Sequence, residues 1–168
     1  MNIRNAMAED LPRIMEIYAC AREYMAANGN PNQWGGTNWP PEDLIRSDIN
    51  LGKSYVCEDA GRIVGVFFYD QGRDVEPTYK VIEDGNWSDD ELYGVIHRIA
   101  SDGSVKGVGT FCFNWALCQC SHLRADTHPD NNPMQKLLAK LGFEKRGIIH
   151  VMEDDYPRFA YEITEDKR

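Results

Sequence analysis

The stretch IASDGSVKGVGTFCFNWAL, residues 99–117, joins a predicted strand to a predicted helix through a turn. Residues 93–100 carry the β-branched side chains of a strand and end just before Asp102-Gly103, a pair typical of turns. The apolar residues that follow have the i, i+3, i+4, i+7 spacing of one helix face: Val108, Phe111, Cys112 and Trp115. We therefore predict that a helix begins at or near Gly107.

The predicted turn has the chemistry of an anion site. The first turn of a helix has four backbone N–H groups without partners inside the helix, and it carries the positive end of the helix dipole. Gly107 and Gly109 have no Cβ and let a phosphate approach the backbone, while Lys106 and Thr110 add a charge and a hydroxyl. The alternative is a loop that only turns the chain, and Gly-x-Gly alone does not separate the two.

Residues 105–110, Val-Lys-Gly-Val-Gly-Thr, resemble the acetyl-CoA signature of the GNAT N-acetyltransferase superfamily, Arg/Gln-x-x-Gly-x-Gly/Ala. Ser104 stands where that signature has Arg or Gln. A second segment, NNPMQKLLAKLGF at residues 131–143, resembles the family's Asn-x-x-Ala-x-x-Leu-Tyr-x-x-x-Gly-Phe, with Leu138 in place of the tyrosine often assigned as the acid for the leaving thiolate. The resemblance implies acetyl-CoA as cosubstrate and no metal. It assigns cofactor contacts to Ile99, Ala100, Ser104, Val105, Lys106, Gly107, Val108, Gly109, Thr110, Asn131, Met134 and Lys136.

The remaining patterns predict the order strand–helix–helix–strand–strand–strand–helix–strand–helix–strand–strand, which is the order of the GNAT fold. Predicted helices begin near residues 8, 41, 107 and 132, the last with Asn132 as its N-cap. The predicted strands are residues 2–6, 54–58, 62–69, 93–100, 122–128, 143–152 and 158–164, with a turn at 153–157 between the last two. Residues 71–91 form a long polar excursion. We predict one α/β domain over residues 1–168, with a mixed, mostly antiparallel sheet flanked by helices.

Composition narrows the partners and the compartment. The chain has 27 acidic and 18 basic residues, a net charge of −9, which disfavours nucleic acid and is compatible with a cationic amine. We find no apolar run of about 18 residues and no signal-peptide pattern, so we expect no membrane association. Five cysteines without metal-type spacing indicate a reducing compartment, and we predict a cytoplasmic protein. Family precedent also makes a homodimer plausible.

The resemblance implies direct attack of an amine on acetyl-CoA in a ternary complex, with an oxyanion N–H at Ile99 or Ala100. A base near neutral pKa is needed, and strand alternation places His97 on the same face as Ile99. Asp126 and His128 on the next strand are a second candidate, although these histidines can also be structural. A metal bound by His97, Asp126 and His128 lacks the usual ligand number and spacing.

The acceptor site and the acid for the leaving thiolate are less well defined by the sequence. Trp34 and Trp39, in the loop 32–41, either line the acceptor site or cover the edge of the core. Without a tyrosine at position 138, the thiolate acid is Tyr156, Tyr161, water or nothing. A covalent route through Cys112, Cys118 or Cys120 is rejected.

Two nucleotide-binding classes lack their motifs. The third glycine of a dinucleotide fingerprint is replaced by Cys112, and no Gly-Lys-Ser/Thr follows the glycines. The remaining alternative is an acyl-CoA sensor or interaction module that has lost transfer, because Ser104 and Leu138 depart from the family pattern.

Overall fold

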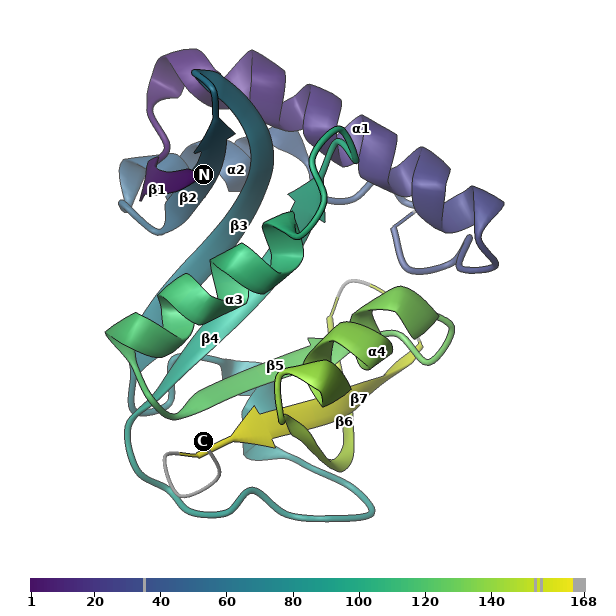
Figure 1. Ribbon diagram of the computed structural model, residues 1–168. Helices are drawn as coiled ribbons and strands as arrows, with labels where there is room; N and C mark the ends of the chain where they lie inside the picture. Colours follow the sequence, from purple (N-terminus) through teal and green to yellow (C-terminus); the bar gives the residue numbers. More distant parts are fainter. Residues whose placement is uncertain (35, 153, 155, 165–168) are drawn as a thin grey trace. The chain divides into compact units, whose positions relative to one another are not determined.

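The computed structural model describes residues 1–34, 36–152, 154 and 156–164. The chain divides into two compact units (Figure 1). Unit 1 comprises residues 1–69 and 97–115, and unit 2 comprises residues 70–96 and 116–168. Two strands and one helix contribute residues to both units, and the expectation of one domain over residues 1–168 stays a prediction.

Seven strands form one mixed sheet in the order β1-β2-β3-β4-β5-β7-β6. Most pairs with a determined register are antiparallel, whereas β4 and β5 are parallel. The strands are β1 (Asn2–Asn5), β2 (Ser54–Asp59), β3 (Arg62–Gly72), β4 (Tyr93–Ser101), β5 (Leu123–Thr127), β6 (Glu144–His150) and β7 (Pro157–Ile163). The α-helices are α1 (Leu11–Ala27), α2 (Glu42–Asn50), α3 (Val108–Gln119) and α4 (Asn132–Lys140). The predicted fold class, a mixed sheet flanked by helices, is confirmed.

Unit 1 is built on the apolar stripe of α1. Leu11, Ile14, Ile17 and Tyr18 are buried in one core cluster with side chains of α2, β2 and β3. The helix begins at Leu11, because residues 8–10 form a short 3₁₀ turn, η1 (Ala8–Asp10), rather than the predicted first α-helical turn. The α-helix therefore begins three residues later than the sequence predicts.

In unit 2, β5 lies between β4 and β7. Gly94 pairs with Leu123 and Val95 with Arg124 in the parallel ladder, and Leu123 pairs with Ile163 in the antiparallel one. Arg124 and His128 are buried although both side chains are polar. Both faces of this strand are covered because it is central to the unit, and its polar residues have partners of their own.

Residues 71–91, where the sequence leaves open whether a short helix or a strand forms, contain the 3₁₀ helix η2 (Pro77–Lys80) and a bridge to β6. Glu83 and Ile148 exchange two backbone hydrogen bonds of 2.8 Å. A Cβ built on Gly85 would lie 1.7 Å from the carbonyl oxygen of Arg146, so only glycine allows this approach. The excursion is thereby fixed to the edge of the sheet.

The start of α4 differs by one residue from the sequence prediction. Asn131 is the N-cap of α4, because its side-chain oxygen accepts the N–H of Met134 at 3.2 Å, and the predicted cap Asn132 is the first helical residue. In the predicted turn 153–157, Glu153 and Asp155 lie outside the described residues.

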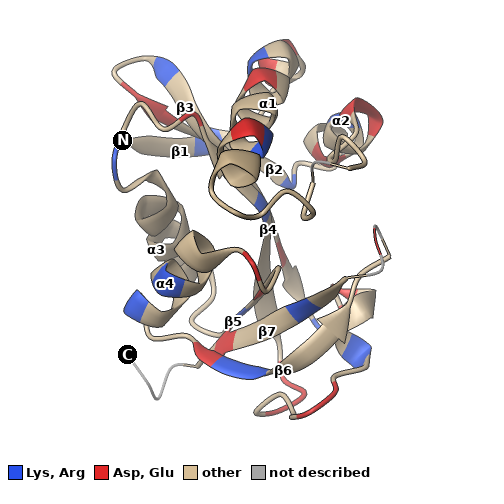
Figure 2. Ribbon diagram, turned by 90° about the vertical axis from the view of Figure 1, so that its right-hand side faces the viewer, with Lys and Arg blue, Asp and Glu red and all other residues tan. Residues whose placement is uncertain are grey.

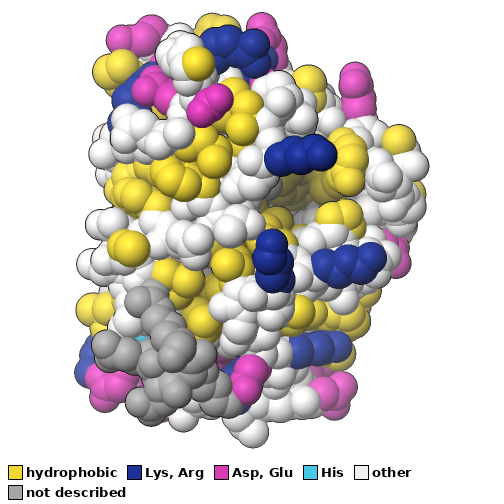
Figure 3. Space-filling model, in the orientation of Figure 1, with side chains coloured by type: hydrophobic (Ala, Val, Ile, Leu, Met, Phe, Trp, Pro, Cys, Tyr) yellow, Lys and Arg dark blue, Asp and Glu magenta, His cyan; other side chains and the backbone are white. Residues whose placement is uncertain are grey.

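Charged residues of both signs occur together on the described surface. Along α1, Arg13 and Glu16 form an ion pair of 3.0 Å. Figure 2 shows both basic and acidic positions along this helix. Basic and acidic side chains also both appear on the face shown in Figure 3. Among the described helices, none has the length and apolar content needed to cross a membrane.

Candidate functional site

The turn between β4 and α3 is held by the carboxylate of Asp102. This carboxylate accepts the backbone N–H of Ser104 at 2.9 Å and the Ser104 hydroxyl at 2.6 Å, and it is also paired with Arg13. Partial burial opposes ionisation, but the bonds from Ser104 and Arg13 outweigh it and lower the pKa of Asp102. Gly103 has φ 75°, the left-handed conformation that the predicted Asp-Gly turn requires. The turn is therefore a fixed structure.

The turn ends at Gly107, where α3 begins as predicted. Gly107 has φ 84°, and a Cβ built on it would meet no atom within 4 Å. The next residue, Val108, is buried against β3, where a Cβ on Gly65 would lie 2.5 Å from the Val108 side chain. The first turn of α3 is thus packed on one side and open at Gly107, which is the shape that an anion cradle needs.

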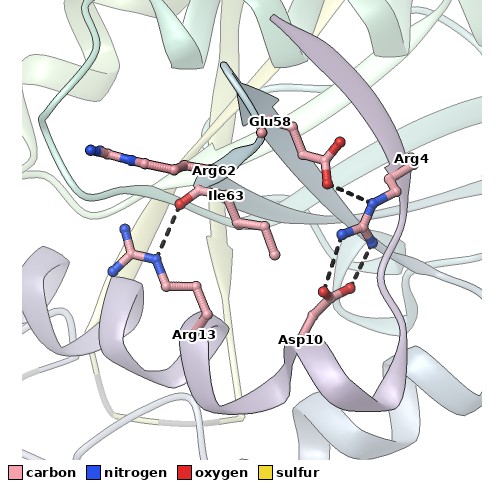
Figure 4. A pocket seen from close by; sticks show the side chains of 7 residues that line it. Arg4, Asp10, Arg13, Glu58, Arg62 and Ile63 are labelled. Carbon is pink, nitrogen blue, oxygen red and sulfur yellow. Dashed lines mark hydrogen bonds and ion pairs between the residues drawn. The ribbon is translucent and has the colours of Figure 1, made fainter.

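A pocket of about 650 Å³ lies in the same unit, between η1, α1 and the β2–β3 hairpin. Its charged side chains are Arg4, Asp10, Arg13, Glu58 and Arg62 (Figure 4). Arg4 binds Asp10 at 2.6 Å and Glu58 at 2.8 Å, and these carboxylates raise the pKa of Arg4 against partial burial. Arg62 instead donates to the Ser104 hydroxyl at 3.2 Å, which connects the hairpin to the turn.

The strand that leads into the turn contains an unusual residue that sequence reasoning missed. Arg98, in β4, has φ 51°, which is rare for a residue other than glycine and is found where surroundings enforce it. The Tyr18 hydroxyl donates to the Arg98 carbonyl at 2.9 Å, Asp48 pairs with its guanidinium at 2.7 Å, and Phe68 lies 4.5 Å below the guanidinium carbon. We call Tyr18, Asp48, Phe68 and Arg98 the Arg98 clamp.

The clamp fixes the backbone at the predicted catalytic positions. His97 and Ile99 flank Arg98, so regular strand alternation does not hold across them and does not show that their side chains share a face. The Asp48 carboxyl is buried, and burial raises its pKa although Arg98 and His97 oppose the rise. Ala100, a predicted oxyanion position, lies in β4 two residues after Arg98 and is buried in the core of unit 1.

Asp126 and His128, the second predicted base pair, belong to unit 2 and have other partners there. Asp126 accepts the hydroxyl of buried Tyr79 at 2.8 Å. His128 is 3% exposed, and its Nδ1 accepts the backbone N–H of Asp130 at 3.1 Å. Burial and nearby Arg158 lower the pKa of His128, which keeps the ring neutral with its proton on Nε2. In that tautomer Nε2 is a donor, so this geometry suits His128 to donating a hydrogen bond rather than to taking a proton.

The remaining predicted residues divide between the units. Asn131, Met134 and Lys136 lie at the start of α4, in unit 2. Leu138, in place of the family's tyrosine, is fully buried. Burial raises the pKa of Tyr161, while Tyr156 is exposed with its ring 5.2 Å from that of His128. Neither tyrosine is distinguished as an acid by these contacts.

Trp34 and Trp39 lie in unit 1, on the loop that follows α1. Trp34 packs against the core cluster with its ring edge-on to Tyr18, 5.8 Å between centroids. The backbone N–H of Trp39 donates to the Trp34 carbonyl at 3.2 Å. Trp34 therefore covers the core and also touches a member of the Arg98 clamp.

The cysteines have the character expected from the sequence. Cys112 is buried beside the thiol of Cys57, and that contact together with burial raises the Cys112 pKa far above its usual range. A thiol in this state is a poor nucleophile. Among the described residues no group of three or more metal-ligating side chains is found.

Comparison with solved structures identifies the fold. An acetyltransferase of the GNAT family from Streptococcus agalactiae superposes with a TM-score of 0.85 at 29% identity, over 98% of this chain and 95% of that one. The chain has the GNAT fold. An acetyltransferase structure from Staphylococcus aureus matches with a TM-score of 0.70 at 26% identity, covering 98% of this chain and 99% of that one. The GNAT fold of this chain thus supports acyl transfer as its general chemistry.

More distant GNAT relatives add the fold alone. A ribosomal-protein-alanine N-acetyltransferase from Brucella melitensis has a TM-score of 0.64 at 16% identity, over 98% of this chain and 99% of that one. Neither a protein-family model nor a curated protein matches the chain.

Proposed function

We propose that the protein is an N-acetyltransferase that moves the acetyl group of acetyl-CoA to a primary amine of a small molecule or peptide. The observation that carries this proposal is the turn 102–107, which is held by Asp102 and ends at Gly107 with open space at the start of α3. A Cβ-bearing residue there would fill the space that a phosphate needs. The acetyltransferases from S. agalactiae and S. aureus support the reaction class.

The residues of the turn suit the phosphates of acetyl-CoA. The backbone of Gly107, Val108 and Gly109 offers donors at a helix N-terminus, and Lys106 is exposed beside them. We assign further contacts to Ser104, Val105, Thr110, Asn131, Met134 and Lys136, as the family motifs imply. When bound, acetyl-CoA supplies the acetyl group as a thioester.

The chain's own residues must hold the amine neutral and stabilise the developing oxyanion. We propose that a backbone N–H at Ile99 or Ala100 donates to the oxyanion, because the Arg98 clamp fixes the backbone next to it. His97 is the favoured base, directly or through a water, since His128 already uses its Nδ1 as an acceptor. Direct attack in a ternary complex is favoured over a covalent intermediate, because Cys112 is buried as a thiol.

The experiment is calorimetric titration of the purified protein with acetyl-CoA, followed by measurement of free-thiol release on adding polyamines, amino acids, aminoglycosides or peptides. Binding with release on one acceptor class supports the transferase and identifies its acceptor. Binding without release across the panel favours the sensor that has lost transfer. No binding overturns the proposal.

The matched variants are Gly107→Glu and Gly29→Glu. Both glycines have left-handed backbones, φ 84° and 83°, and neither has an atom within 4 Å of a built Cβ. The two substitutions therefore impose the same backbone strain and add the same charge, but only the first places them in the cradle. We expect Gly107→Glu to abolish acetyl-CoA binding and Gly29→Glu to retain it, and equal affinities would place acetyl-CoA elsewhere.

Two features of the proposal concern the protein's setting. The five cysteines are all free, which supports a reducing compartment such as the cytoplasm. A homodimer is proposed from family precedent, and sedimentation equilibrium measures it. The amine acceptor remains the only further partner proposed.

A further inference from the structure

We propose that Arg62 binds a phosphate of acetyl-CoA and thereby replaces the long side chain that the family carries where this chain has Ser104. The inference rests on the proposed function and concerns the same cradle. It assigns a cofactor-binding residue that lies outside both family motifs, on the β2–β3 hairpin.

The hairpin brings Arg62 to the turn. Arg62 is the first residue of β3 and pairs with Asp59 across the hairpin. Its Nη2 donates to the Ser104 Oγ at 3.2 Å, so a guanidinium group reaches the position whose side chain is shortened. In Figure 4 the side chain of Arg62 extends away from the Arg4–Asp10 ion pair, although all three residues line the same pocket.

The hydrogen bonds of Ser104 give this contact a direction. The Ser104 hydroxyl donates its one proton to Asp102 at 2.6 Å, which leaves its lone pairs to accept from Arg62. Asp102 is itself held by Arg13. This series of contacts, from Arg13 through Asp102 to Ser104, orients the Arg62 guanidinium beside the turn. The other N–H groups of that guanidinium remain for a ligand.

The charge balance separates Arg62 from its neighbours. Arg4 is paired with Asp10 and Glu58, and Arg13 is paired with Glu16 and Asp102. Across residues 1–34, 36–152, 154 and 156–164, no ion pair with a carboxylate is found for Arg62. Its guanidinium is thus not held by a direct ion pair, and a guanidinium forms short, charge-assisted hydrogen bonds with phosphate oxygens.

The first test compares the wild type with Arg62→Ala by calorimetric titration with acetyl-CoA. Loss of one charge-assisted contact is expected to weaken binding by roughly tenfold. Arg46→Ala is the control, because Arg46 is an exposed arginine of α2 paired with Glu42 and should leave the affinity unchanged. Equal affinities of Arg62→Ala and the wild type would overturn the assignment of Arg62.

The second test moves the guanidinium to the family's position. We expect the double variant Arg62→Ala, Ser104→Arg to regain most of the acetyl-CoA affinity that Arg62→Ala loses. No recovery would contradict the inference that Arg62 replaces the family's side chain at position 104. Titration with acetyl-dephospho-CoA, which lacks the 3′-phosphate, shows which phosphate Arg62 contacts. If Arg62 contacts the pyrophosphate, Arg62→Ala still weakens binding of this ligand. If Arg62 contacts the 3′-phosphate, the variant and the wild type bind it equally. A wild type that fails to bind acetyl-CoA at all would overturn the proposed function instead.

Discussion

The buried carboxylate of Glu162 leads us to predict that unit 2 loses stability in acid. Its side chain is 0% exposed and accepts from His122 at 2.8 Å, from Arg124 at 2.9 Å and from the backbone N–H of Ser88 at 3.0 Å. Arg146 adds an ion pair at 2.8 Å. Burial disfavours the charge, but these bonds outweigh it and lower the pKa of Glu162 from 4.5 to about 2.

The magnitude follows from linkage. Because the folded-state pKa lies below the unfolded one, the ionised carboxylate stabilises the fold above about pH 4.5, and this contribution is lost as the pH falls toward 2. A difference of this size is equivalent to about 3 kcal/mol at neutral pH. That is a large share of the roughly 5–15 kcal/mol by which a domain is stable.

The assay is urea unfolding followed by tryptophan fluorescence between about pH 7 and pH 3. Trp87 reports on the site, because its ring lies 4.5 Å from the guanidinium of Arg124. We expect Glu162→Gln to be about 3 kcal/mol less stable than the wild type at pH 7, with the difference narrowing as the pH falls. The control is Glu91→Gln, since Glu91 pairs with Arg73 in solvent. A difference between Glu162→Gln and the wild type that is independent of pH would refute this reasoning.

The other predictions concern the candidate site in unit 1. His97→Ala should lower turnover several-fold and remove the acidic limb of the pH–rate profile while leaving the acetyl-CoA affinity unchanged, and wild-type turnover from about pH 6 to 9 would exclude His97 as the base. Asp48→Ala should cost about 3 kcal/mol in urea unfolding, because it leaves the Arg98 guanidinium buried without its ion pair, whereas exposed Asp43→Ala on the same helix should cost under about 0.5 kcal/mol. Equal stabilities of the Asp48 and Asp43 variants would remove the clamp as a stabilising contact.

The sequence was sufficient for the α-helices, the strands and the turn before α3, because these depend largely on local chemistry. The apolar spacing from Val108 onward predicted the helix α3, and Asp102-Gly103 predicted a turn that has a left-handed Gly103. The predicted buried face of α3 was only partly right, because Phe113, Ala116 and Leu117 are buried with Val108 and Cys112, whereas Phe111 and Trp115 are partly exposed. The long excursion 71–91 was not predictable, since its structure depends on a bridge to Ile148, far along the chain. The N-cap of α4 was placed at Asn132 instead of Asn131, because both residues are asparagines and have the same preference for the N-cap position.

The Arg98 clamp was not predictable for a different reason. A positive φ at an arginine is unfavourable locally, so no propensity predicts it, and only the partners on three other elements enforce it. One signal was present in the sequence, since a charged residue interrupts an otherwise apolar strand at 93–100. A buried charge in a strand requires a partner, and that requirement pointed to an acid such as Asp48 without identifying it.

The two departures from the family motifs have different consequences. At position 104 the serine side chain is short enough for another residue to reach the same place, and Arg62 already does so at 3.2 Å. At Leu138 the side chain is fully buried, so the hydroxyl that the family places there has been replaced by core packing. Because a thiol of pKa about 8.5 leaves as an anion near neutral pH, acetyl transfer does not require an acid at that position. Binding therefore needs compensation for its missing group, whereas release of the thiolate does not, and the buried leucine is compatible with an active enzyme.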